Sequence, residues 1–235
     1  IEYASRIQRA LLPPEQILEK QGLEHFILFR PRDIVSGDFY WFGKNNGKTF
    51  LVVADCTGHG VPGAFMSMLG ISFLDEIVIK SGMSDTNKIL DALRSHVIKS
   101  LRQTGHSIDE STKDGMDLAM VAIDDQTKQV QYSGAYNPLY VVRKLSNEEK
   151  NILEKGKELE LERRSIHNNT YLLYQVKADH MPIGISEKDH AFSATLIDEK
   201  ECTIYLFSDG YVDQFGGPLG KKFMSRNFKR LLLDI

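Results

Sequence analysis

The sequence predicts an α+β fold in which two mixed or antiparallel sheets are stacked with helices outside them. Strand-like segments come in long runs rather than alternating with helices, which argues against a doubly wound parallel sheet. One pair of helices interrupts these runs, over 61–79 and from Ser84 or Asp85 to about 101. The chain has 235 residues, of which 42% are hydrophobic. A chain of this length can bury roughly three quarters of its unfolded surface in a core.

The N-terminal segment is expected to be helical. Apolar residues recur at helical spacing from Ala4 to Leu11, and a Pro-Pro pair then ends the helix. We interpret residues 1–20 as an N-terminal helix that ends a regulatory linker from an upstream domain. A helix packed on the core is the alternative. Residues 21–235 then form one domain.

The expected strands are apolar or alternating runs that are bounded by turn residues. They lie at about 24–30, 38–43, 49–54, 117–123, 129–134, 138–143, 170–177, 191–197 and 203–208. A last helical pattern runs from Met224 to Leu232. Residues 145–169 are rich in Glu, Lys and Asn, so we expect a solvated insertion there.

Composition excludes several classes of protein. With 29 Lys and Arg against 32 Asp and Glu, a net charge of -3 and no long basic run, general nucleic-acid binding is not expected. Cys56 and Cys202 are too few and too far apart for a disulfide framework or zinc motif, so a reducing compartment such as the cytoplasm is the default. No run of ~18 apolar residues and no signal peptide is present. The start at Ile1 and the stop at Ile235 inside a helical pattern suggest a piece of a longer protein.

Three aspartates share one sequence context. Asp38, Asp55 and Asp209 each follow an apolar strand and precede small or turn-forming residues. A carboxylate at the mouth of a buried strand is costly unless it is neutralised, and a divalent cation would neutralise it. Oxygen ligands favour Mg²⁺ or Mn²⁺ over zinc. Two such ions about 3.5–4 Å apart can activate a water for phosphoester hydrolysis. For any single aspartate, an ordinary turn is the alternative.

Residues 58–63 spell G-x-G-x-x-G between a strand and a helix, which is also typical of a dinucleotide-binding turn. Asp55 would repel a pyrophosphate at this place, and the next elements are helices rather than a βαβ unit. His59 in this loop could be a general acid, a phosphate contact or a loop-anchoring donor, and we favour the anchoring role. Asp117 and Asp213 could each complete a metal site or cap a turn.

Taken together, these motifs resemble the bacterial PPM (PP2C-type) serine/threonine phosphatases of the SpoIIE/RsbU family. The matching segments are 4–13, 36–38, 54–60, 132–138, 181–184 and 207–210. The resemblance implies a four-layer α-β-β-α sandwich with two Mn²⁺ or Mg²⁺ ions, and in some relatives a loosely held third. It also implies that the domain removes phosphate from phosphoserine or phosphothreonine in a signalling protein.

The resemblance assigns roles to individual residues. Asp55 matches the carboxylate that bridges the two metals, and Cys56 stands where a backbone carbonyl contributes a ligand. Asp209 matches a ligand of the first metal. Asp38 matches an acidic residue that holds metal-bound water, and Asp213 stands where some relatives bind the third metal. His59 and Asp117 are at most auxiliary.

One departure from the family leaves an alternative open. Relatives end with a further helix and strand whose Asp-Asp segment completes the first metal site, and this sequence stops before it, so the domain is expected to be truncated. The alternative is a non-catalytic signalling or partner-binding module of the same fold. Relatives act on anti-sigma-factor antagonists under the control of upstream sensor domains. The resemblance therefore implies a cytoplasmic domain, alone or as the output of a larger or membrane-attached protein, and the helical start hints at a homodimer.

Overall fold

The computed structural model describes the chain except for residues 1, 15, 20–21, 104–113, 160–164 and 219. The helices are α1 (Glu2–Leu11), α2 (Gln16–Glu19), α3 (Val61–Leu74), the π-helix η1 (Asp75–Lys80), α4 (Thr86–Ser100), α5 (Asn147–Glu154) and α6 (Met224–Asp234). The strands are β1 (Phe39–Asn45), β2 (Lys48–Cys56), β3 (Met116–Asp124), β4 (Val130–Ala135), β5 (Leu139–Lys144), β6 (Ile166–His167), β7 (Tyr171–Val176), β8 (Thr195–Ile197), β9 (Cys202–Tyr205), β10 (Phe215–Gly216) and β11 (Lys221–Lys222).

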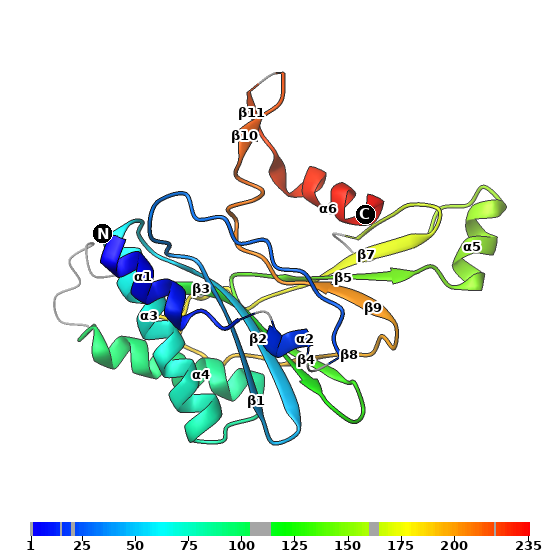
Figure 1. Ribbon diagram of the computed structural model, residues 1–235. Coiled ribbons are helices and arrows are strands. Elements are labelled where there is room, and N and C mark those ends of the chain that lie inside the picture. Colours follow the sequence, from blue (N-terminus) through cyan, green and yellow to red (C-terminus); the bar gives the residue numbers. More distant parts are fainter. Residues whose placement is uncertain (1, 15, 20–21, 104–113, 160–164, 219) are drawn as a thin grey trace.

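The strands form two antiparallel sheets and one separate hairpin. The first sheet has the order β1-β2-β3-β4-β8 and the second β6-β7-β5-β9, while β10 pairs only with β11. Figure 1 shows α3 and α4 beside the first sheet, α6 near the second, and the β10–β11 hairpin projecting away from both. The prediction of two mixed or antiparallel sheets, in place of a doubly wound parallel sheet, is confirmed.

Three separate apolar clusters show the layer order. Alternate residues of β3 point to opposite faces, as the two-residue period of a strand requires. Leu118 and Met120 join the cluster formed with α3 and α4, whereas Ala119 and Val121 join the cluster formed with the second sheet. A third cluster joins that sheet to α6. The order is therefore helix, sheet, sheet, helix, which confirms the predicted four-layer sandwich.

Two sequence expectations need correction. Residues 24–30 alternate in exposure but are in no strand ladder, although the Phe26 ring contacts Tyr205 of the edge strand β9 at a centroid distance of 6.3 Å. The side chains of this segment contact the sheet, but its main chain does not pair with a strand. The expected solvated insertion at 145–169 begins with a buried residue, Leu145, and contains the helix α5, which has no buried residue and starts with a capping box formed by Ser146 and Glu149.

The expected helix over 61–79 changes character at its end. It is α-helical to Leu74 and continues as the π-helix η1, where Asp75 accepts a 2.9 Å hydrogen bond from Trp41 Nε1. Among the described residues, the segment from Val61 to Lys80 is long and apolar enough to cross a membrane by length and composition alone. Half of that window is buried inside the fold. Such burial is what a core helix of a folded domain shows.

The N-terminal helix is fastened to the rest of the fold through a buried glutamine. Gln8 Nε2 donates to the Ser36 carbonyl at 2.6 Å and to Ser67 Oγ of α3 at 2.7 Å. Gln8 Oε1 accepts from the Ser36 backbone N–H at 3.0 Å. One side chain therefore joins α1, the loop before Asp38 and α3. The expected boundary between a linker at 1–20 and a domain at 21–235 stays a prediction.

Replacing Gln8 with Leu should lower the free energy of unfolding by about 1–3 kcal/mol, because it leaves the buried Ser36 N–H and carbonyl without partners. Urea denaturation of the variant and the wild type would measure the difference. Arg9→Leu introduces the same side chain at an exposed position of α1 and serves as the control. Equal losses in the two variants would contradict a specific role for the amide.

Candidate functional site

Strand ends bring four aspartates to one edge of the sandwich. In the β2–β3 ladder Asp55 lies directly opposite Asp117. Asp38 immediately precedes β1, whose first residue, Phe39, pairs with Ala54. Asp209 follows β9 in the other sheet. Residues far apart in the sequence thus meet where antiparallel strands of both sheets begin or end.

The carboxylates are close enough to change each other's ionisation. Burial, followed by the charges of Asp38 and Asp209, raises the pKa of Asp55 to about 8, and Asp55 is hydrogen-bonded to both of them. Burial and the charge of Asp209 raise the pKa of Asp117 to about 6. Like charges held together in a partly desolvated place favour protonation. The cluster therefore carries fewer negative charges at neutral pH than four isolated aspartates would.

A serine hydroxyl orients one member of the cluster. Ser208 Oγ donates a 2.6 Å hydrogen bond to Asp38 Oδ2. Because Ser208 directly precedes Asp209, this bond joins the end of the second sheet to the start of β1 in the first. The sequence alone does not predict this role for Ser208, since the position of Ser208 directly before a candidate aspartate is the one local signal that indicates it.

Three glycines allow the loops beneath Asp38 and Asp55 to approach closely. A Cβ on Gly37 would lie 3.0 Å from the Gly58 carbonyl and 3.1 Å from the Cys56 carbonyl, and one on Gly63 only 2.6 Å from the Gly58 carbonyl. These contacts are with backbone, which cannot move aside as a flexible side chain can. The Cys56 carbonyl thus lies close to Gly37, and its role as a backbone ligand stays a prediction.

The glycine-rich loop does not belong to a dinucleotide-binding fold. Its strand, β2, is antiparallel to both neighbours, and α3 leads into η1 and α4 rather than into a parallel strand. A dinucleotide turn needs a βαβ unit. The structure therefore supports the rejection of that alternative.

The remaining candidates lie in different surroundings. Asp213 forms an ion pair with Lys222 at 2.6 Å, and its backbone N–H donates to the Asp209 carbonyl at 3.0 Å. A third metal at Asp213 stays a prediction. His59 is exposed and forms no hydrogen bond or ion pair with any other residue that the structure describes, so the favoured loop-anchoring role finds no support. Cys56 is a buried free thiol and Cys202 a half-buried one, and burial raises the pKa of both.

The chemistry of the cluster fits a divalent cation. Within the described ranges, no group of three or more His, Cys, Asp or Glu side chains is already arranged to hold a metal ion. However, a hydrogen-bonded set of carboxyl groups turns its oxygens toward one another, whereas ionised oxygens rotate toward a cation. The mutual approach of Asp38, Asp55 and Asp209 is the stronger guide. Burial, together with the charges of Asp38 and Asp209, raises the pKa of Asp55, and a bound cation would lower it again.

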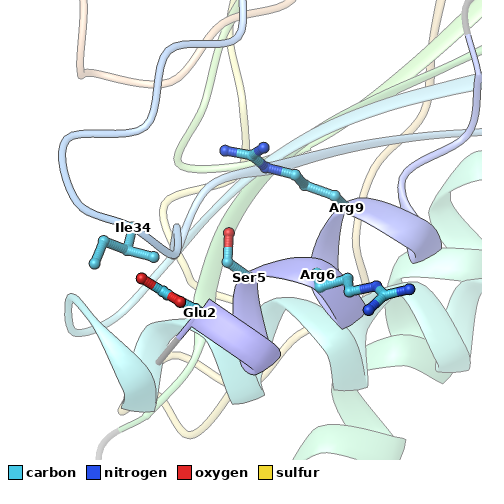
Figure 2. A pocket seen from close by; sticks show the side chains of 5 residues that line it. All are labelled: Glu2, Ser5, Arg6, Arg9 and Ile34. Carbon is cyan, nitrogen blue, oxygen red and sulfur yellow. The ribbon is translucent and has the colours of Figure 1, made fainter.

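A cavity of about 340 Å³ lies elsewhere, against α1, and its lining residues are Glu2, Ser5, Arg6, Arg9 and Ile34. Figure 2 shows Glu2 at the start of α1 lying close to Ile34, while the Arg6 side chain points away from Ile34. None of the four aspartates lines this cavity. The carboxylate cluster is therefore not part of this pocket.

Known proteins share this fold and these motifs. A family model described as Stage II sporulation protein E (SpoIIE) matches residues 45–161. The SiaA-PP2C domain of Pseudomonas aeruginosa is 31% identical, with 99% of this chain and 80% of that chain covered and a TM-score of 0.74. No curated protein matches the chain.

Two more distant structures show the same fold. The SpoIIE phosphatase domain with a regulatory fragment from Bacillus subtilis is 19% identical, with a TM-score of 0.57 over 86% of this chain and 48% of that one. The RsbU and RsbW domains of a Mycobacterium tuberculosis protein are 17% identical, with a TM-score of 0.56 over 86% and 46%. The fold is thus that of PP2C-type phosphatase domains. The chain belongs to the bacterial PPM phosphatases of the SpoIIE family, as its motifs indicated.

Proposed function

We propose that the domain is a metal-dependent protein serine/threonine phosphatase that hydrolyses phosphoserine in a signalling protein. The observation that carries this proposal is the convergence of Asp38, Asp55 and Asp209, where burial and the neighbouring carboxylates raise the pKa of Asp55. Membership of the SpoIIE family supports the reaction class. Three converging carboxylates are a donor set that two Mg²⁺ or Mn²⁺ ions would neutralise.

Each residue has a distinct part in this proposal. Asp55 and Asp209 would hold the cations through carboxylate oxygens, and Cys56 through its backbone carbonyl. Bound cations would polarise the phosphoryl oxygens and lower the pKa of a water. Asp38, oriented by Ser208, would accept a hydrogen bond from the attacking water and so align it with phosphorus. The bond between phosphorus and the serine oxygen of the substrate would break as the water oxygen bonds to phosphorus, so that serine leaves with a proton from the water and inorganic phosphate is released.

The biological setting is proposed from the family. The substrate would be a phosphoserine protein of the anti-sigma-factor antagonist kind, and an upstream sensor domain would act through α1. A cytoplasmic location fits the two free thiols. A homodimer through a continued α1 is a further proposal, and it accords with the exposed Tyr3 and Ile7 on that helix.

Hydrolysis of p-nitrophenyl phosphate and of a phosphoserine peptide, with Mn²⁺, with Mg²⁺ or with EDTA, would test the proposal. We expect turnover of both substrates that requires either metal and disappears with EDTA. The alternative, a non-catalytic partner-binding module, is favoured by the lack of a preformed metal-holding group among the described residues. A folded protein that binds Mn²⁺ in calorimetry without turnover, or binds none, would favour that module.

Ser208→Ala should lower kcat about tenfold while the fold is retained, because removal of a hydrogen bond to a metal-site carboxylate typically costs ten- to a hundredfold in activity or metal affinity. Ser208→Thr keeps the hydroxyl and should restore most of the rate. Steady-state kinetics and a Mn²⁺ titration would measure both effects. A Thr variant as slow as the Ala variant would show that the hydroxyl has no positioning role.

A further inference from the structure

The β10–β11 hairpin and the start of α6 form a surface beside the carboxylate cluster. A cavity of about 610 Å³ lies here, and its lining includes Tyr211, Gln214, Phe215, Lys221, Lys222 and Phe223. Figure 1 shows the hairpin standing clear of both sheets, connected to β9 by the segment that contains Asp209. We call these six residues the hairpin surface.

The turn that begins at Asp209 connects the hairpin surface to the cluster. Tyr211 is two residues from Asp209, and its ring packs edge-on against Phe223 at 5.6 Å. The Asp213–Lys222 ion pair links the end of the hairpin to the turn that begins at Asp209. A peptide whose phosphoserine reaches the cluster therefore has the hairpin surface as an immediate neighbour.

The hairpin surface combines an exposed aromatic ring with positive charge. Phe215 is 74% exposed and Tyr211 39%, whereas most large apolar side chains of the fold are buried. Residues 211–235 hold five Lys and Arg against two Asp, although the whole chain has a net charge of -3. Asp213 neutralises Lys222, but Lys221 and Arg226 are exposed and form no ion pair with any described residue. The positive charge of Lys221 is therefore available to a partner.

We infer that the hairpin surface docks an acidic segment of the phosphoprotein substrate next to the phosphoserine. This inference rests on the proposed phosphatase function. A cationic surface beside the cluster attracts an anionic substrate and steers it to the site. Phe215 supplies an aromatic anchor of the kind that dominates interface energetics.

Two phosphoserine peptides of equal length, one with Asp and Glu around the phosphoserine and one with Asn and Gln, would test the inference. The wild type should have a lower KM for the acidic peptide. Lys221→Glu should raise that KM about tenfold, in the range of a reversed rim charge, and leave the KM for the neutral peptide nearly unchanged. Lys157→Glu is the matched control, because this exposed lysine follows α5 at the opposite end of the sandwich.

Phe215→Ala should raise KM several-fold for both peptides, and neither variant should alter hydrolysis of p-nitrophenyl phosphate, which is too small to reach the hairpin.

Fluorescence anisotropy with the labelled acidic peptide reports docking even without turnover. Absence of p-nitrophenyl phosphate hydrolysis would therefore contradict the phosphatase function alone. Equal binding of the acidic peptide to wild type and Lys221→Glu would overturn the docking inference. The docking inference would also be overturned if Phe215→Ala changed the oligomeric state and left the peptide preference unchanged, because the hairpin surface would then join two copies of the chain.

Discussion

Asp55→Asn should lower kcat/KM for p-nitrophenyl phosphate about a thousandfold at saturating Mn²⁺, in the upper range for loss of one electrostatic contact in an active site. Asp55 lies at the centre of the cluster, hydrogen-bonded to Asp38 and Asp209 and opposite Asp117 in the ladder. An amide keeps the size of the side chain but offers a neutral oxygen and a donor in place of a carboxylate. Initial rates across a Mn²⁺ titration would measure the loss.

The control is Asp198→Asn, which makes the same chemical change at an exposed position just after β8. The β4–β8 register places that position near Val130, at the opposite end of β4 from the cluster. Full activity is expected for Asp198→Asn, and both variants should retain the circular dichroism of the wild type. If Asp55→Asn kept its rate and its metal dependence, the reacting centre would have to lie elsewhere.

The candidate aspartates could be found in the sequence because their signal is local. An apolar strand that runs directly into Asp and a turn residue indicates a carboxylate at a sheet edge, whichever strands are neighbours. Asp55 and Asp209 meet that condition. For Asp38 the prediction was wrong, because no strand precedes it and it lies immediately before β1. The order of the strands in the sheets decides whether these aspartates converge. Periodicity does not predict that order, whereas the resemblance to SpoIIE phosphatases implied the convergence.

The contacts that support the cluster depend on distant parts of the chain. The Ser208–Asp38 bond joins residues of the two sheets, and Gln8 reaches Ser36 across the N-terminal helix. Nothing near Gln8 in the sequence distinguishes it from an exposed polar residue on an amphipathic helix. In fact α1 buries Ser5 and Gln8 and exposes Ile7, the reverse of the expected packing of an apolar stripe.

The extended segment at 24–30 shows the limit of periodicity in another way. Alternating side chains predict the direction in which residues point, and the alternation in exposure is present. Whether a ladder forms depends on the distance to the edge strand β9, which no local pattern encodes. Likewise, the ion pair between Asp213 and Lys222 depends on the hairpin between them, so spacing from Asp209 alone could not predict it.

The metal-free protein should lose stability as the pH rises from about 4 to about 8. In the folded state burial and neighbouring carboxylates raise the pKa of Asp55 to about 8, whereas the ordinary value is 3.8. Between these values the folded state binds more protons than the unfolded state, so the free energy of unfolding falls with rising pH. Asp117, with a pKa raised to about 6, adds to this trend at its lower end.

The expected contribution of Asp55 to this loss of stability is about 2 kcal/mol. This is well below the free energy that corresponds to the whole pKa shift, because the side chain is only half-buried and solvent screens its interactions. Urea denaturation of wild type and Asp55→Asn in EDTA from pH 4 to pH 9 would measure it, since titrating groups outside the cluster cancel in the difference. The Asn variant should gain stability over the wild type as the pH rises, and level off above pH 8. Saturating Mg²⁺ should reverse the order at high pH, because the wild-type carboxylates then bind a cation instead of a proton. A constant difference between the two proteins across this range would show that Asp55 ionises normally and that the carboxylates do not share the cluster seen in the fold.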